Sequence, residues 1–298
     1  NVYNEWTIIS KYHYELSSIA NASTSIRYQY EDGWTKEEDR AFTFWVRPKY
    51  KKPIGNNVLI LSIVNNNGKV QLNAGNLPTF GNVISVGDWV NIRGTQSYNS
   101  LYKVIEIIGD SIVIDEPYID DILATGSPTF NKEVSNNFMI YENDLIPPTQ
   151  NVSFTYTYNW FIMKINDSYY KWKISQPFIK DDWYAIVINL NATARQLSLF
   201  VYNTLKTSGA VNPDLTDTLN LIYNQTKTYS PVGVKNNDTW KILGCQTDLT
   251  NIRIWQKPIE EELQSLILSQ YVVKDTHLTL LLDNASPQLM LQDVTDAR

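Results

Sequence analysis

Residues 152–158 read Val-Ser-Phe-Thr-Tyr-Thr-Tyr, in which apolar or aromatic side chains alternate with small polar ones. This period of two is typical of a β-strand that turns one face toward a core. The same alternation returns at residues 42–47, 169–174 and 197–202. Strands of this kind leave the second face partly wet, as in an antiparallel sandwich, whereas strands of a buried parallel sheet are apolar on both faces. The pattern therefore predicts an all-β fold, built as an antiparallel two-sheet sandwich.

One segment, residues 258–271, has helical rather than strand periodicity. Pro258 suits the first turn of a helix, and Glu260, Glu261 and Glu262 place negative charge near the positive end of the helix dipole. The apolar residues that share one helical face are Ile259, Leu263, Leu266, Ile267 and Tyr271. We expect one short C-terminal helix that caps the sandwich, with a partner-binding helix as the alternative.

Residues 79–130 have the character of a separate module. Short apolar runs between residues 83 and 115 are separated by turn signals, of which Gly109-Asp110 suits a two-residue hairpin. Several short strands in about 50 residues favour a small SH3-like β-barrel, and such modules are tolerated as insertions when their chain ends lie close together. The predicted division is a sandwich of residues 1–78 and 131–298 with the barrel inserted between them.

Composition narrows the classes of protein. The chain has 298 residues, 43% hydrophobic and 19% charged, and a net charge of -6. This apolar content excludes wholesale disorder, and the acidic balance argues against nucleic acid as the main partner. No apolar run is long enough for a membrane-spanning helix, and no signal peptide is visible. Because the chain does not begin with Met, we expect a processed product or a fragment.

The small number of cysteines and histidines excludes disulfides and some kinds of metal site. Cys245 is the only cysteine, so neither an internal disulfide nor a cysteine-based zinc cluster can form. The two histidines, His13 and His277, are too far apart in sequence to form a helical metal pair. Burial and sheet hydrogen bonds must therefore hold the chain together.

The last third of the chain carries a series of short motifs. In chain order these are Asp182-Trp-Tyr-Ala-Ile-Val-Ile188, Gln196-Leu-Ser-Leu-Phe-Val-Tyr-Asn203, Leu249-Thr-Asn-Ile-Arg-Ile-Trp255 and the helix start Pro258-Ile-Glu-Glu261. Their order resembles the laminin-G-like, concanavalin A-like lectin/glucanase jelly roll, although the second strand lacks the residue that the family has before its final Asp or Asn. Upstream, residues 42–48 resemble the family's early strand, and the resemblance implies residues 58–64 as its partner. The match covers about residues 25–75 and 135–285.

The inserted module has a resemblance of its own. Val86-Gly-Asp-Trp-Val90 and Tyr102-Lys-Val104 are similar to small barrels found within structural proteins of large tailed bacteriophages. This resemblance implies a virion protein rather than a cellular one.

Catalysis is the first chemistry to test, because some proteins of this fold are glycoside hydrolases. Retaining hydrolases need two carboxylates about 5–5.5 Å apart. In laminarinase-like members of the family, these lie at alternate positions of a Glu-x-Asp-x-Glu strand. Residues 37–41 and 142–146 come near this pattern, but both lack the third carboxylate. Since acids in loops are usually solvated, we predict that the chain is not an enzyme.

Calcium is the second chemistry, because laminin-G-like domains often bind it through oxygen ligands at the sandwich rim. Candidate loops are Asn65-Asn-Asn-Gly68 and Asn236-Asn-Asp238. Neither has a dense acidic cluster, and turn-forming Asn explains both. We therefore predict no cofactor and assign no metal ligand, with calcium left as an alternative.

Carbohydrate binding is the third chemistry, because sugar rings stack on exposed aromatic side chains. The candidates are strand residues turned away from the core, namely Trp45, Tyr169, Phe200, Tyr202 and Trp255. The competing interpretation is that the N-terminal segment, the inserted module or a neighbouring subunit covers them. The sequence leaves a glycan site and a protein interface equally open.

Taken together, these patterns predict a non-enzymatic structural or decoration protein of a tailed-phage virion. Its expected partners are other virion proteins, in an oligomeric or multi-copy arrangement, and a host surface glycan; neither nucleic acid nor membrane insertion is expected. The alternative is a secreted carbohydrate-binding lectin module, and a glycoside hydrolase is the third interpretation.

Overall fold

A computed structural model describes most of the chain. The described residues are 6–10, 13–16, 25–30, 39–48, 57–74, 84–120, 126–143, 150–165, 168–204, 219–229, 238–243, 247–255, 257–269, 278–282 and 292–293. The chain divides into two compact units: the first is Asn1–Lys51 with Asn136–Arg298, and the second is Lys52–Ser135. No helix among the described residues is long and apolar enough to cross a membrane.

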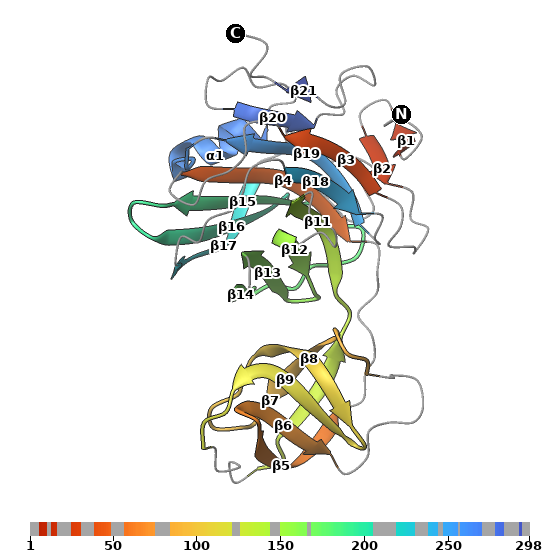
Figure 1. Cartoon of the computed structure of the whole chain (residues 1–298). Helices are drawn as coiled ribbons and strands as arrows, with labels where there is room; N and C mark the ends of the chain where they lie inside the picture. Colours follow the sequence, from red (N-terminus) through yellow and green to blue (C-terminus); the bar gives the residue numbers. More distant parts are fainter. Residues whose placement is uncertain are drawn as a thin grey trace. The chain divides into compact units, whose positions relative to one another are not determined.

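The first unit is a sandwich of two antiparallel sheets (Figure 1). The six-stranded sheet has the order β14 (Ser168–Lys173), β13 (Trp160–Ile165), β12 (Gln150–Tyr156), β11 (Asn136–Asn143), β18 (Asp238–Leu243) and β3 (Ser25–Tyr30). The seven-stranded sheet has the order β17 (Leu219–Thr228), β16 (Gln196–Thr204), β15 (Tyr184–Asn191), β4 (Arg40–Pro48), β19 (Thr247–Trp255), β20 (Leu278–Leu282) and β21 (Gln292–Asp293). A separate hairpin pairs β1 (Trp6–Ser10) with β2 (His13–Leu16). The predicted fold class is confirmed.

Aromatic rings fill the space between the two sheets. Phe42 of β4 lies 5.2 Å, centroid to centroid, from Phe154 of β12, and the two rings meet edge to face. Phe44 lies 5.3 Å from Phe138 of β11 in the same manner. Edge-to-face pairs stabilise a core by about 0.5–1.5 kcal/mol beyond the area that they bury. The period-two pattern of the sequence therefore identified the inward-facing residues correctly.

The outward face of β4 is not wet, in contrast to the sequence prediction. All nine residues of Arg40–Pro48 are buried, which includes the outward Thr43, Trp45 and Arg47. The cover is α1 (Glu261–Leu268), which packs against the seven-stranded sheet through Leu268. Alternation locates one buried face of a strand but does not show whether another element covers the opposite face.

The helix is shorter than predicted and turns a different face to the sheet. It covers residues 261–268 rather than 258–271, and Leu263 is exposed whereas Gln264 is fully buried. Gln264 lies inside because its side-chain amide forms hydrogen bonds there, which apolar periodicity cannot reveal. As predicted, the helix caps the sandwich, and Glu261 and Glu262 occupy its first turn.

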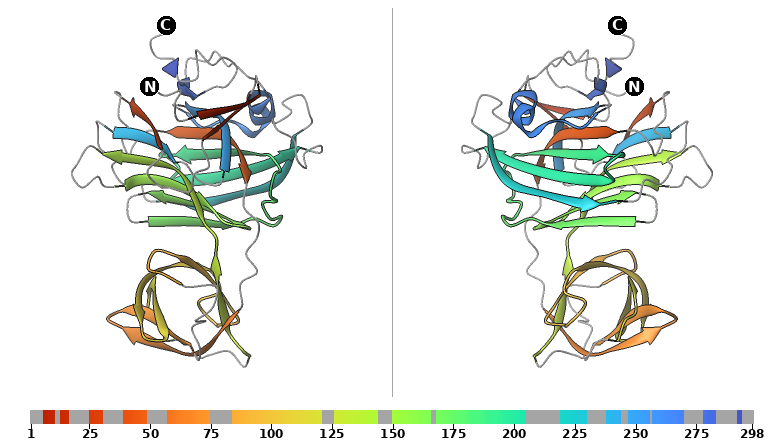
Figure 2. Two further views of the ribbon diagram at one scale, coloured as in Figure 1. Left: turned by 90° about the vertical axis from the view of Figure 1, so that its right-hand side faces the viewer. Right: turned by 90° about the vertical axis from the view of Figure 1, so that its left-hand side faces the viewer.

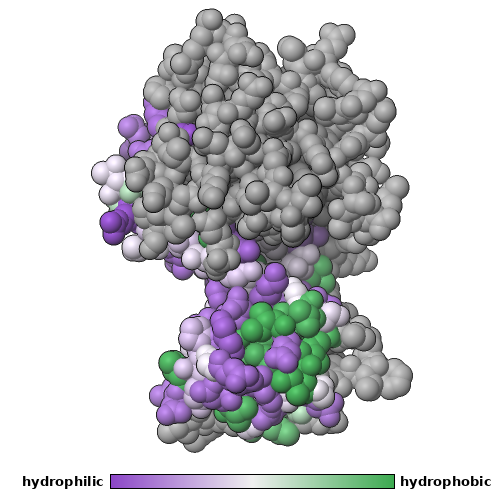
Figure 3. All heavy atoms as spheres, in the orientation of Figure 1, coloured by the Kyte–Doolittle hydropathy of each residue, from purple (hydrophilic) through white to green (hydrophobic). Residues whose placement is uncertain are grey.

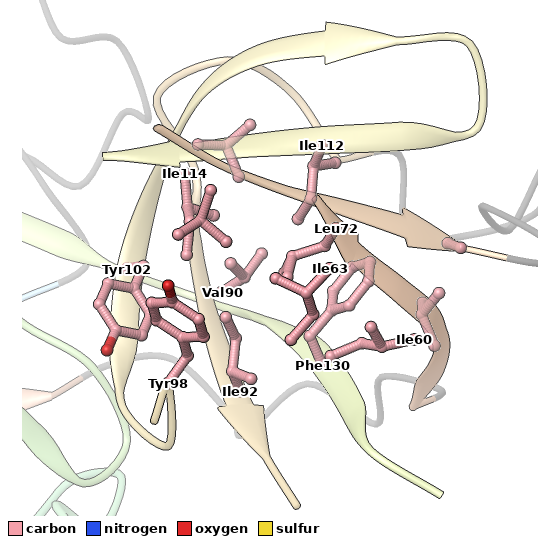
Figure 4. Close-up of a cluster of buried hydrophobic side chains, with 14 of the residues drawn as sticks. Ile60, Ile63, Leu72, Val90, Ile92, Tyr98, Tyr102, Ile112, Ile114 and Phe130 are labelled. Carbon is pink, nitrogen blue, oxygen red and sulfur yellow. The ribbon is translucent and has the colours of Figure 1, made fainter. Parts of the chain in front are cut away.

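The second unit is a closed barrel (Figures 1 and 2). Around the barrel, the strands are β10 (Thr129–Glu133), β5 (Val58–Asn66), β6 (Lys69–Ala74), β9 (Ser111–Pro117), β8 (Leu101–Ile108) and β7 (Trp89–Arg93). Every strand contributes inward side chains to one cluster, among them Ile60, Leu72 and Phe130 (Figure 4). The interior is thus a packed core rather than a cavity lined by polar groups.

The predicted boundaries of this module, 79 and 130, were too narrow. The compact unit extends over 52–135, so β5 and β6 belong to the barrel. The family resemblance implied that residues 58–64 pair with residues 42–48. This is wrong, because β5 pairs with β6 and β10 instead. The physical reason is closure: without β5 between β10 and β6, the barrel would have two open edges.

Two predicted turns are present in the barrel. Ile108 pairs with Ser111, so Gly109-Asp110 forms the two-residue hairpin that the sequence indicated. In the β5–β6 hairpin, Asn67 and Gly68 have φ values of 51° and 83°, and the Gly68 amide donates to Asn65 Oδ1 at 2.7 Å. These asparagines therefore have a role in the turn. They are the same residues that the calcium alternative would have required as ligands.

Gly68→Ala tests the left-handed conformation of this turn. No heavy atom lies within 4 Å of the position of an added Cβ, so the cost is confined to the backbone. We expect a loss of about 1 kcal/mol in the free energy of unfolding, measured by urea titration. Gly126→Ala is the matched control, because Gly126 also has open space but no positive φ. Equal effects of the two substitutions would contradict the argument.

Candidate functional site

The five predicted aromatic residues fall on different sheets. Trp45, Phe200, Tyr202 and Trp255 lie in the seven-stranded sheet, and Tyr169 lies in β14 at the edge of the six-stranded sheet. The first four are at most 8% exposed. The expectation that these four form an exposed platform for a glycan is therefore wrong in this structure.

The helix is what covers these aromatic residues. Trp45, Phe200 and Tyr202 form one cluster with Leu268 of α1, and Trp255 packs with Ile259 just before the helix. The helix is not among the three covers that the sequence suggested, although β2 of the N-terminal segment also lies against β19. The sequence does contain a signal for this helical cover. It has an amphipathic helix, and several strands carry large aromatic residues on the face that was predicted to be exposed to solvent.

Polar groups of the sheet also hold the helix. The Tyr202 hydroxyl donates to Gln264 Oε1 at 2.6 Å, and Gln264 Nε2 donates to the carbonyl oxygen of Ile259 at 3.1 Å. Burial raises the pKa of the Tyr202 hydroxyl to about 12, and the nearby Glu261 carboxylate adds to this rise. The hydroxyl therefore remains a donor throughout the neutral pH range.

The two ends of the helix segment are fixed by further hydrogen bonds. At the beginning, Asn189 Nδ2 donates to the Ile259 carbonyl oxygen at 2.8 Å and Asn189 Oδ1 accepts from the Ile259 amide at 3.0 Å. At the end, Arg253 donates to the carbonyl oxygen of Ile267 at 2.8 Å, and Trp45 Nε1 donates to that of Leu268 at 3.3 Å. Carbonyls in the last turn of a helix lack the regular partners of the helix interior, and these side-chain donors supply hydrogen bonds to two of them.

Tyr169 is the one predicted residue that remains half-exposed. Lys164 Nζ lies over its ring, 5.7 Å from the centroid, which is a cation–π arrangement. The register pairs Lys164 with Tyr169, Ile162 with Lys171 and Trp160 with Lys173, so these side chains share one face of the β13–β14 hairpin. Strands β12, β13 and β14 contain no Asp or Glu. This face suits an acidic or polar partner.

The barrel carries most of the exposed apolar surface. Among the described residues, eleven large apolar side chains are exposed, and eight of them lie on the barrel. These eight are Leu59, Leu61, Val64, Val86, Ile105, Ile107, Ile108 and Ile119. Figure 3 shows apolar side chains gathered over β8 and β9, with hydrophilic ones among and around them. Sequence reasoning missed this surface, because alternation in the barrel strands was used only to find a core.

Of the two acidic segments that came near a hydrolase pattern, the structure describes the side chain of one acid, Asp39. Asp39 Oδ1 accepts a hydrogen bond from the Ala192 amide at 2.7 Å, while residues 37, 38 and 144–146 lie outside the described residues. Within the described residues, no three His, Cys, Asp or Glu side chains are grouped so that they could hold a metal ion. Residues 236 and 237 of the second candidate calcium loop also lie outside the described part.

Comparison with known proteins gives little further guidance. No known protein family and no curated protein matches the chain. Among solved structures, the chain is similar to the full extracellular region of zebrafish Gpr126/Adgrg6, with 9% sequence identity and a TM-score of 0.34. The similarity covers 93% of this chain and 42% of that chain, so this chain spans less than half the length of that protein. At this TM-score the likeness carries no argument.

Tyr202→Phe tests the hydrogen bonds beneath the helix. Loss of the hydroxyl leaves the buried Gln264 Oε1 without its donor, so we expect the free energy of unfolding to fall by about 1–2 kcal/mol. Tyr223→Phe is the control, because the Tyr223 hydroxyl donates to Gln225, which is exposed and can bind water instead. We expect the control to change stability by less than about 0.5 kcal/mol. If denaturant titration gives equal losses, the Tyr202–Gln264 bond has no special role.

Proposed function

We propose that this chain is a non-enzymatic structural or decoration protein of a tailed-phage virion that works through protein–protein contacts. The observation that carries the proposal is the concentration of exposed aliphatic side chains on the barrel, eight of the eleven among the described residues. Removal of apolar surface from water stabilises a contact by about 25 cal/mol per Å². Three of the eight, Ile105, Ile107 and Ile108, lie together on β8, and contiguous exposed apolar side chains are typical of interaction sites.

Two features of the barrel support contact through its outer surface. Its strands close on themselves, so no free edge remains for the addition of a partner strand. Its interior is filled by buried apolar side chains, so it leaves little room for a small ligand. The outward side chains are what remains for recognition.

The sandwich supports the same proposal because most of its candidate sugar-binding residues are buried. Trp45, Phe200, Tyr202 and Trp255 are buried beneath the helix, so the aromatic face of this sheet is unavailable to a sugar. The choice of a virion rests on the resemblance of residues 86–90 and 102–104 to barrels of tailed-phage structural proteins. The proposed partners are accordingly other virion proteins, with the chain present in many copies.

Quantitative mass spectrometry of purified particles tests the proposal. We expect the protein in many copies per particle, and we expect a variant with Leu61→Asp, Ile105→Asp and Ile108→Asp to be incorporated at least about tenfold less. Ile179→Asp and Leu263→Asp are the matched controls, because these exposed apolar residues lie outside the barrel. Particles that lack the protein, or that incorporate the barrel variant normally, would contradict the proposal.

A secreted carbohydrate-binding module is the second candidate, favoured by the Lys164–Tyr169 pair on the β13–β14 face. A half-exposed ring beside an ammonium group suits a sugar that carries a carboxylate or sulfate. On a glycan array, we expect such a module to lose binding with Tyr169→Ala and to retain it with Tyr223→Phe. Glycan binding by a protein that is absent from particles would favour this candidate over the first.

A further inference from the structure

Two surfaces of this chain differ in charge, and each carries exposed or half-exposed side chains. The first, the acidic aliphatic surface, lies on the β8–β9 hairpin and consists of Ile105, Glu106, Ile107, Ile108 and Asp110, all exposed. Figure 3 shows the apolar part of the barrel surface over these strands. Its aliphatic groups would gain from burial, and its two carboxylates would be repelled by another acidic surface.

The second, the lysine surface, lies on the outward face of β13–β14 and consists of Lys164, Tyr169, Lys171 and Lys173. Lys173 is exposed and the other three are half-exposed. The backbone register continues the row of Lys164 and Tyr169 across the sheet. That row passes through Ser153 and Ile140 to Lys241 and Arg27. This row thus contains three cationic residues, Lys164, Lys241 and Arg27, and no acid lies on β12, β13 or β14.

We propose that the acidic aliphatic surface of one copy of this chain docks on the lysine surface of a second copy. The proposal rests on the proposed function and names the partner as the chain itself. Glu106 and Asp110 of one copy meet Lys164 and Lys173 of the other. The isoleucines cover the Tyr169 ring and the aliphatic stems of the lysines.

Charge also decides the symmetry of this contact. Two acidic aliphatic surfaces repel each other, and so do two lysine surfaces, so a symmetric contact between identical patches is disfavoured. The favoured contact joins different patches of the two copies. Because each copy has both patches, the contact is either made twice in a reciprocal dimer or repeated to give a ring or an open chain of subunits.

Sedimentation velocity of the full chain gives the first test. We expect the mean sedimentation coefficient to rise over about a hundred-fold increase in protein concentration at low salt. High salt should weaken this association, since the Debye length falls from about 10 Å at 0.1 M to about 3 Å at 1 M. Wild-type protein that stays monomeric throughout would overturn the proposal.

A charge-swap pair of variants gives the sharper test. One variant carries Glu106→Lys with Asp110→Lys, and the other carries Lys164→Glu with Lys173→Glu. Each variant alone has two surfaces of like charge, so each should be monomeric. In a mixture, every barrel surface again has an oppositely charged partner, so association should return to at least about a tenth of wild-type affinity.

Controls and the remaining outcomes complete the design. Asp120→Lys and Lys180→Glu change charge on exposed residues outside both surfaces and should leave association unchanged. Recovery in the mixture also shows that both variants are folded. If the single variants still associate, or the mixture fails to recover, the proposal is wrong. Particles that contain a chain which stays monomeric in solution would overturn this proposal and leave the proposed function standing.

Discussion

The sandwich depends on the burial of both faces of one strand. All nine residues of β4 are buried, because its inward phenylalanines pack against the opposite sheet and its outward Trp45 packs beneath α1. The two faces of β4 lie in different environments, one apolar and one with hydrogen-bonding groups. Thr43 and Arg47 fit the second environment: Thr43 accepts a hydrogen bond from Trp255 Nε1 at 3.1 Å, and the Arg47 guanidinium stacks 5.1 Å from the Trp183 ring centroid.

Polar contacts make the helix a fixed part of the sheet rather than a removable cover. Arg253 and Trp45 donate to carbonyls in the last turn of α1, and Asn189 holds the segment that leads into it. Removal of the helix would exchange these hydrogen bonds for bonds to water, at about 0.5–1.5 kcal/mol each, and would also expose the apolar groups that it covers. The aromatic residues beneath it therefore serve stability, which explains why residue types that are suitable for sugar binding form no binding surface here.

Local periodicity correctly predicted features that depend on a single strand or a single turn. The inward residues Phe42 and Phe154 and the Gly109-Asp110 hairpin follow from alternation and turn chemistry alone. The sequence could not show which elements meet: β5 has the same alternation whether it pairs in the sandwich or in the barrel, and closure of the barrel decides between them. Likewise, Gln264 rather than Leu263 faces the sheet because Tyr202, distant in sequence, supplies its hydrogen-bond partner.

The two units differ in where they keep their apolar side chains. Both are packed inside, but among the described residues the barrel exposes more aliphatic side chains than the sandwich does; those of the barrel include Leu61 at 54% and Ile108 at 42%. The chain leaves the sandwich after β4 and returns at β11, two strands whose Phe44 and Phe138 rings touch in the core. The strands of the insertion belong to neither sandwich sheet, so the outer residues of the barrel take no part in the strand pairing of the sandwich. Selection can therefore adapt that outer surface to a partner without disturbing the fold that holds it.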